Sequence, residues 1–142
     1  MDISINYSTV IARCKDFSAF EGREYFSQDG ESLYSSVLIT DQDDDLVNGY
    51  IVTSMQLIEE VIAKKAACSF TTSGCTFALE VDESRFVKQG SLGKNIEEAS
   101  VAYAMSQWLK ERKPERFEAY DTIFKEMCSV IRTNVYTKKR PS

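Results

Sequence analysis

Histidine is absent from the whole chain of 142 residues, and this absence bears first on catalysis. Histidine is the commonest general base and the usual activator of a serine or cysteine nucleophile. A typical zinc site without histidine loses half of its usual ligands, and there is no CxxC pair among the cysteines Cys14, Cys68, Cys75 and Cys128. We therefore expect a protein that is not an enzyme and that binds no metal and no other cofactor.

Long apolar runs are absent as well, since none approaches the roughly 20 residues that span a membrane. The stretch MDISINYSTV begins with an acid after its methionine and lacks the pattern of a secretory signal. We expect an intracellular protein, or a component of a particle assembled inside a cell, with buried or half-buried free cysteines. The 43% hydrophobic content and the length predict one domain, residues 1–142, with a real core.

Charge of one sign is missing from two stretches. No lysine or arginine lies between residues 24 and 63, and no acid follows Glu126, after which the chain has Arg132, Lys138, Lys139 and Arg140. The 17 basic and 22 acidic residues give a net charge of −5, which argues against general nucleic-acid binding and leaves only a local contact with DNA phosphates. Two interpretations stay open: two solvated surfaces, or complementary faces between neighbouring copies or partners.

The stretch TDQDDDLVNGY, which begins at Thr40, concentrates the acids Asp41, Asp43, Asp44 and Asp45. A calcium loop starting at Asp41 needs glycine at its sixth position and glutamate at its twelfth, where Leu46 and Val52 stand. A helix start fits better, because Thr40 can cap free N–H groups and the acids lie at the positive end of the helix dipole. Apolar residues follow at helical spacing and predict a helix over residues 41–65.

Three further helices follow from the same spacing. The first is predicted over residues 6–19 with Asn6 or Ser8 as its cap, and the third of the four begins near Asn95. The last helix begins at Pro114, which suits a first helical position. Its apolar seam is Phe117, Tyr120, Phe124, Met127 and Ile131. We expect this seam to pack inside the molecule, with the last two helices antiparallel.

Alternating apolar residues between the second and third helices predict a small β-hairpin. A two-residue turn at Ser73-Gly74 places Phe70 opposite Phe77. A polar connector follows from Asp82 as far as the third helix. The predicted fold class is therefore mainly α: a four-helix bundle-like domain with a small β-hairpin inserted between the second and third helices.

Two irregular segments complete the chain. Residues 20–39 combine turn signals with many aromatic side chains, and we expect them to lie over the core or over a neighbouring subunit. Residues 137–142 form a basic tail.

Several residues that could serve a site have a structural interpretation. Trp108 lies at core spacing on its helix, and Glu59 and Glu60 lack a second metal-binding motif, which predicts a solvated face. The stretch GSLGK (90–94) is too short for a phosphate-binding loop and has no Ser or Thr after its lysine.

Taken together, the motifs DQDDDLVNGYI, LIEEVIAKK, SQWLKERKPERFEAYD and VYTKKRP resemble those of the small head–tail connector and head-completion proteins of tailed bacteriophages. The similarity is greatest to variants carried by prophages of Bacteroides-type gut bacteria. It covers residues 33–141, whereas the aromatic-rich N-terminal third departs from the simplest connectors.

This resemblance implies a structural virion protein, found in the host cytoplasm before assembly, that forms a ring between portal and tail. Its partners are then its own copies and the portal or tail components. The hypothesised interface joins the acidic helix start to a basic surface on a neighbour, made of Arg132, Lys138, Lys139 and Arg140. The competing interpretations are a cytoplasmic interaction module, such as a small regulator or inhibitor, and a carboxylate-based metal enzyme.

Overall fold

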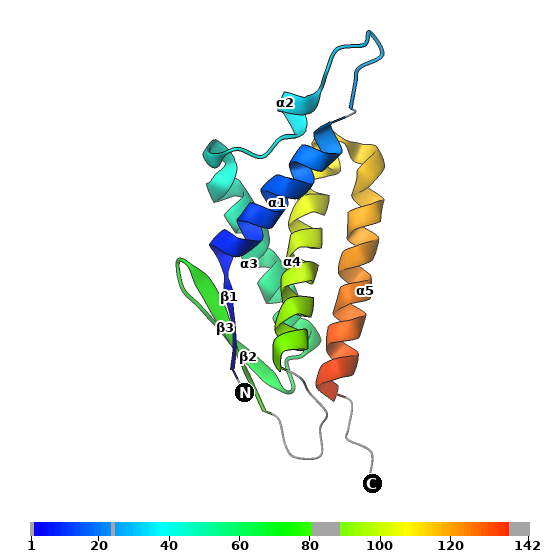
Figure 1. Cartoon of the computed structure of the whole chain (residues 1–142). Helices are drawn as coiled ribbons and strands as arrows, with labels where there is room; N and C mark the ends of the chain where they lie inside the picture. Colours follow the sequence, from blue (N-terminus) through cyan, green and yellow to red (C-terminus); the bar gives the residue numbers. More distant parts are fainter. Residues whose placement is uncertain (1, 24, 81–88, 137–142) are drawn as a thin grey trace.

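The structure is a computed structural model that describes residues 2–23, 25–80 and 89–136 (Figure 1). The elements in this part of the chain are β1 (Asp2–Asn6), α1 (Tyr7–Gly22), α2 (Tyr34–Val37), η1 (Asp41–Asp43), α3 (Asp44–Val61), β2 (Ala66–Phe70), β3 (Gly74–Leu79), α4 (Gln89–Arg112), η2 (Pro114–Arg116) and α5 (Phe117–Tyr136). Within these residues, the long helices α1, α3, α4 and α5 and a small antiparallel sheet confirm the predicted fold class.

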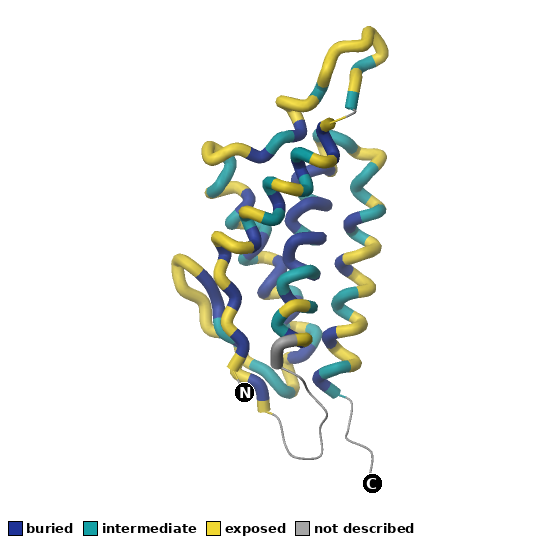
Figure 2. Tube along the Cα trace, in the orientation of Figure 1, coloured by how far each residue is buried: buried dark blue, intermediate teal, exposed yellow. Residues whose placement is uncertain are grey.

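Helix α4 is the central element. The other long helices and β1 all contact it, and Figure 2 shows a mostly buried middle section between the outer helices. Apolar residues on much of its circumference explain this position: Ile96, Val101, Met105 and Leu109 are all buried. The outer helices therefore share one core around α4, and they contact one another less than they contact α4.

The beginning of α4 was predicted too late. The helix starts at Gln89 and not near Asn95, so residues 89–94 are helical and not part of a connector; residues 82–88 of that connector lie outside the described residues. Leu92 is buried, and a Cβ added to Gly93 would meet Ile3 Cγ2 of β1 at 3.3 Å. This packing partner is distant in the chain, so the local spacing gives no sign of it.

Strand β1 was not predicted, and it makes the hairpin a sheet with the order β1-β3-β2 in the described residues. Both neighbouring pairs are antiparallel. Ile3 and Ile5 alternate with polar residues and are buried, which is the pattern of a half-buried strand. Gly74 allows the close approach of β1, because an added Cβ would collide with the carbonyl oxygen of Ile5.

The predicted hairpin register was wrong by two residues. Phe70 pairs with Cys75 and not with Phe77. The turn is centred one residue earlier than predicted, on Thr72 and Ser73. The Thr71 side chain takes part in it, because its hydroxyl oxygen accepts a hydrogen bond from the Gly74 N–H at 3.1 Å. The Thr71 N–H in turn donates to the Gly74 carbonyl at 2.9 Å and closes the loop.

The first and last helices lie close to their predicted positions. Helix α1 begins after Asn6, whose Oδ1 accepts from the Ser8 N–H at 2.9 Å, and continues to Gly22. In α5, Phe124 is buried and its ring centre lies 5.1 Å from that of Tyr103 on α4. The predicted seam is therefore an intramolecular contact between these two helices.

Trp108 belongs to the core, as predicted. Its side chain is 2% exposed, and its Nε1 donates to the Val37 carbonyl at 2.6 Å. The Arg112 guanidinium lies over the ring at 3.5 Å from the centroid. This residue therefore joins α4 to the segment before α3.

The segment between α1 and α3 has two parts. Residues 25–33 form a short hairpin, the projecting arm, in which the Leu33 N–H donates to the Tyr25 carbonyl at 2.8 Å. The arm extends beyond the bundle and is largely exposed (Figures 1 and 2). Val37 and Ile39 are buried. The expectation that the segment lies over the core therefore holds only for its second part.

Candidate functional site

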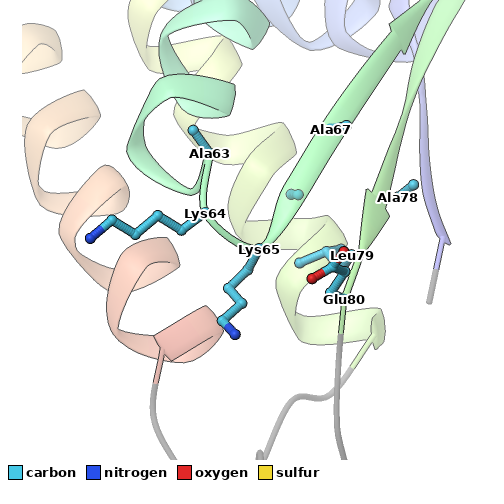
Figure 3. Close-up of a pocket in the computed structure, with 8 residues that line it drawn as sticks. Ala63, Lys64, Lys65, Ala67, Ala78, Leu79 and Glu80 are labelled. Atoms are coloured by element: carbon cyan, nitrogen blue, oxygen red, sulfur yellow. The ribbon is translucent and has the colours of Figure 1, made fainter.

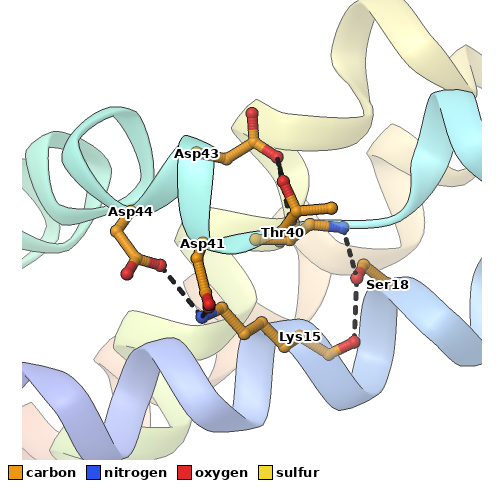
Figure 4. Close-up of polar contacts among 7 residues, drawn as sticks. Lys15, Ser18, Thr40, Asp41, Asp43 and Asp44 are labelled. Carbon is orange, nitrogen blue, oxygen red and sulfur yellow. Dashed lines mark hydrogen bonds and ion pairs between the residues drawn. The ribbon is translucent and has the colours of Figure 1, made fainter.

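The acidic end of the molecule is defined as Asp41, Asp43, Asp44 and Asp45. Two of these residues, Asp41 and Asp44, contact Lys15 of α1 (Figure 4). Lys15 Nζ lies 2.6 Å from Asp41 Oδ1 and 3.0 Å from Asp44 Oδ1, so one cation holds two of the predicted interface carboxylates. The hydrogen bond and positive charge of Lys15 lower the pKa of Asp41, while hydrogen bonds to both carboxylates raise the pKa of Lys15. The Asp41 side chain is 93% exposed, so water screens this pairing strongly.

Asp43 caps the helix start. Its Oδ2 accepts hydrogen bonds from the Thr40 N–H at 2.9 Å and from the Thr40 hydroxyl at 3.1 Å. Thr40 is the N-cap residue, as the sequence predicted, and Asp43 forms a capping box with it. Ser18 of α1 holds Ile39, the residue before Thr40. The Ser18 Oγ accepts a hydrogen bond from the Ile39 N–H at 2.9 Å and donates one to the Lys15 carbonyl at 2.8 Å (Figure 4).

Asp45 is the member of the acidic end that is best placed for a partner. It is exposed, and the contacts of Lys15 and Thr40 go to the other three aspartates. Leu46 beside it is 45% exposed. Any partner of this end therefore meets a surface with an apolar side chain beside its carboxylates.

Arg132 lies at the far end of the bundle, where α3 and α5 finish. It is exposed and lines a hollow of about 560 Å³ together with Lys64 and Glu60. A neighbouring hollow of about 330 Å³ opens between the end of α3 and strands β2 and β3, with Lys64 and Lys65 on its border (Figure 3). Three predicted basic members of the interface lie outside the described residues: Lys138, Lys139 and Arg140.

The structure does not bring the acidic end and Arg132 together. Helix α3 separates them, and its 18 residues extend about 27 Å at 1.5 Å per residue (Figure 1). A contact between the two surfaces therefore requires two copies of the chain.

A groove lies between α3 and α5, which both pack on α4. Its apolar part is a hollow of about 370 Å³ lined by Leu57 and Val61 of α3 and by Phe124 and Cys128 of α5. It continues into the hollow of about 560 Å³ beside Arg132, because Val61 lines both. The two hollows together are called the α3/α5 groove below. The helical spacing of apolar residues in this part of the chain gave no sign that two of them border a groove.

Glu21 forms a buried ionic cluster that was not predicted. Its side chain is 3% exposed and accepts from Arg116 Nε at 3.0 Å, Tyr120 Oη at 3.1 Å and Lys113 Nζ at 3.3 Å. Burial and the nearby Glu21 carboxylate raise the pKa of Tyr120 to about 12. The hydrogen bond to Glu21 also raises the pKa of Arg116. A glutamate inside the mostly apolar stretch FSAFEG is the sequence signal that could have identified this cluster.

The cysteines are free thiols, as expected. Burial raises the pKa of all four, to about 12 for Cys14 and about 11 for Cys128. Cys75 lies beside the Cys68 thiol and the buried Tyr7 hydroxyl, whose pKa burial raises to about 12. Protonated thiols are poor nucleophiles and poor metal ligands, so these residues act here as packing side chains.

Among the described residues, no three His, Cys, Asp or Glu side chains are arranged to hold a metal ion. Glu59 accepts a hydrogen bond from the Cys68 N–H at the edge of β2, and Glu60 is exposed on the groove border. The same part of the chain contains no helix that is both long and apolar enough to cross a membrane.

The molecule is thus a mainly helical domain with a charged surface at each end and an apolar groove between two outer helices. No protein family, curated protein or solved structure matches the chain. Its function is therefore inferred from these surfaces.

Proposed function

We propose that this chain is a structural protein of tailed-bacteriophage particles that assembles as a ring between portal and tail. The observation that carries the proposal is the separation of charge along the molecule. The acidic end lies at the start of α3, whereas Arg132 and Lys64 lie where α3 and α5 end (Figure 1). The resemblance of the sequence motifs to head–tail connectors supports the same conclusion.

Opposite charges at opposite ends suit a head-to-tail contact between copies. Such a contact uses two different surfaces, and it closes into a ring when the rotation between neighbours divides a full turn. Complementary charge guides the approach and selects the correct neighbour more than it supplies affinity. Asp45 and Arg132 are the exposed described residues that would face each other across the boundary.

Reversal of charge at the acidic end tests this arrangement. We expect Asp43→Lys, Asp44→Lys and Asp45→Lys combined to remove the chain from purified particles, because like charges then face each other. Circular dichroism should still show a folded helical protein. Since Asp43 also caps the helix start, Asp45→Lys alone is the second variant, and it should lower incorporation without touching the cap or Lys15.

A matched control reverses three other exposed acids near the α4–α5 turn: Glu111, Glu115 and Glu118. This triple variant changes net charge by the same amount, and we expect it to enter particles like the wild type. Normal incorporation of both acidic-end variants would contradict the head-to-tail contact.

A cytoplasmic interaction module is the second candidate, and the α3/α5 groove is the feature that favours it. An apolar groove with charged borders can receive a segment of another protein. The two functions differ in one observable: a connector travels with intact particles, whereas a module of the host cytoplasm does not.

A further inference from the structure

We infer that the projecting arm of one copy docks into the α3/α5 groove of a neighbouring copy. This inference rests on the proposed assembly of copies, and it adds the apolar contact that would join them.

The projecting arm presents one aromatic side chain to solvent. Phe26 is 55% exposed, although it pairs with Ser32 in an isolated β-bridge. The adjacent Tyr25 is held on the bundle, because Lys113 Nζ lies 4.9 Å from its ring centroid. Consecutive residues in extended backbone point to opposite sides. Anchoring of Tyr25 therefore directs Phe26 away from the bundle.

The tip of the arm is ordered by its own backbone. The Ser27 N–H donates to the Glu31 carbonyl at 2.8 Å, and the Gly30 N–H donates to the Ser27 carbonyl at 2.9 Å. Gly30 has a φ of +83°, a conformation that residues with a Cβ rarely adopt. A segment that is already formed loses less conformational entropy on docking than a disordered one.

The α3/α5 groove offers a matching apolar receptor. The hollow between Leu57, Val61 and Phe124 has a volume of about 370 Å³, within the range of roughly 300–1,000 Å³ that is usual for ligand pockets. Aromatic side chains seated in such hollows are the usual anchors of protein interfaces. Phe26 is the exposed aromatic residue on the acidic arm, and we assign it this role.

Charge selects the occupant. The arm contains Asp29 and Glu31 and no basic residue. The groove is bordered by Lys64, Lys125 and Arg132 against one acid, Glu60. Lys125 pairs with Asp121 at 2.8 Å, so the complementarity rests mainly on the other two cations.

A second hollow, lined by Arg13, Asp16, Phe17 and Phe20 of α1, is the competing receptor. Its volume is about 390 Å³, and Phe20 is 66% exposed. It carries one cation and one acid, so it offers an acidic arm no electrostatic preference. This difference favours the α3/α5 groove.

The docking must occur between copies. The arm lies beyond the opposite end of the bundle from the hollow beside Arg132 (Figure 1), and α3 between them is about 27 Å long. Each copy therefore gives an arm to one neighbour and receives an arm from another. One such contact is smaller than the roughly 800 Å² per partner of a stable complex, so we expect weak pairing in solution and firm binding in a closed ring.

Two complementary full-length variants isolate one contact in solution. The receiver carries Phe26→Ser and keeps its groove, while the donor carries Val61→Glu and keeps its arm. We expect unlabelled donor to shift the amide signals of ¹⁵N-labelled receiver at Leu57, Lys64 and Cys128. The shifts should saturate as donor approaches about 1 mM, which corresponds to weak binding. Signals at the α1 hollow should stay unchanged.

Matched controls define what each surface contributes. An unlabelled chain with Phe26→Ser should bind the receiver at least about tenfold more weakly than the donor, because the anchor is lost. A labelled receiver with Val61→Glu added should not respond. A labelled receiver with Gln56→Glu added gains the same charge at an exposed position outside the two hollows. Its amide signals should shift as much as those of the original receiver.

Absence of shifts at about 1 mM donor, or shifts centred on Arg13 and Phe20, would overturn the docking. Failure of the proposed function has a different signature, because it is read from particles. If the chain is present in particles but shows no such contact in solution, only the docking is refuted. If the chain shows the contact but is absent from particles, only the virion role is refuted.

Discussion

Two of the ionic clusters that helix α1 forms have opposite designs. At its end, the carboxylate of Glu21 is buried and surrounded by Lys113, Arg116 and Tyr120. Nearer its middle, Lys15 is a single cation that lies between the exposed carboxylate of Asp41 and the partly exposed carboxylate of Asp44. The first cluster surrounds an acid with donors, whereas the second leaves acids facing water.

Because of this difference, we expect the Glu21 cluster to stabilise the fold and the Lys15 cluster to serve recognition of a partner. A buried charge that loses its partners is costly, whereas an exposed ion pair contributes little and weakens in salt. The Glu21 cluster therefore holds α1 to the α4–α5 turn. The Lys15 cluster positions carboxylates that can still contact a partner. Substitutions at Glu21, Tyr120 and Lys15 test this comparison.

Glu21→Gln should cause the largest loss of stability. It keeps the side-chain shape but leaves Lys113 and Arg116 without their carboxylate. Removal of one partner from a buried pair costs about 3–5 kcal/mol, and the 42% exposure of the Arg116 side chain places our expectation near the lower limit. Urea denaturation measures this change, with the exposed Glu60→Gln as the control, expected within about 0.5 kcal/mol of wild type.

Tyr120→Phe should have an intermediate effect at neutral pH. It removes the hydroxyl that donates to Glu21 at 3.1 Å, and a hydrogen bond to a charged group contributes about 1.5–3 kcal/mol. We expect a loss at the lower limit of that range, since two cations still bind the carboxylate. A loss that equals that of Glu21→Gln would show that the hydroxyl and not the charge dominates the cluster.

The same variant has a distinct alkaline signature. The pKa of Tyr120 is raised from 10.0 to about 12 in the folded protein, so the folded state keeps a proton that the unfolded state has lost. This contribution to stability is complete below pH 10 and disappears as the pH rises toward 12. Wild type should therefore lose more stability over that interval than Tyr120→Phe, and equal slopes would contradict the assigned cause.

Lys15→Met should have the smallest effect on stability. Exposed ion pairs contribute about 0–1 kcal/mol, and we expect about 0.5 kcal/mol at low salt that vanishes near 1 M salt. Denaturation at the two salt concentrations measures it. A salt-independent loss as large as that of Glu21→Gln would invalidate the distinction between the two clusters.

Local patterns in the sequence were sufficient to locate the starts of three of the four described long helices. Asn6, the acidic stretch after Thr40 and Pro114 mark three starts correctly, because capping groups and helix-compatible residues act over one turn. The core position of Trp108 also followed from spacing alone.

Contacts between distant segments explain what was wrong or not predicted. Strand β1 finds its partner β3 more than 60 residues along the chain, and Ile3 of the same strand packs against Gly93 in the first turns of α4. Glu21 meets Lys113 across 92 residues. The α3/α5 groove depends on how two helices lean on a third, which no single helix pattern specifies.

The candidate interface was predicted only in part. The acids were located correctly at a helix start, but their separate contacts were not predicted. Asp43 caps the helix start, Asp41 and Asp44 bind Lys15, and Asp45 is exposed. The assignment of these acids to a partner stays a prediction.

Quantitative mass spectrometry of density-purified particles from an induced host that carries this gene would decide whether the chain is a connector. We predict enrichment of the chain at a few to a few dozen copies per particle, as a closed ring requires. Its absence from intact, infectious particles, with abundant protein in the cytoplasm, would contradict the connector role and favour the interaction module.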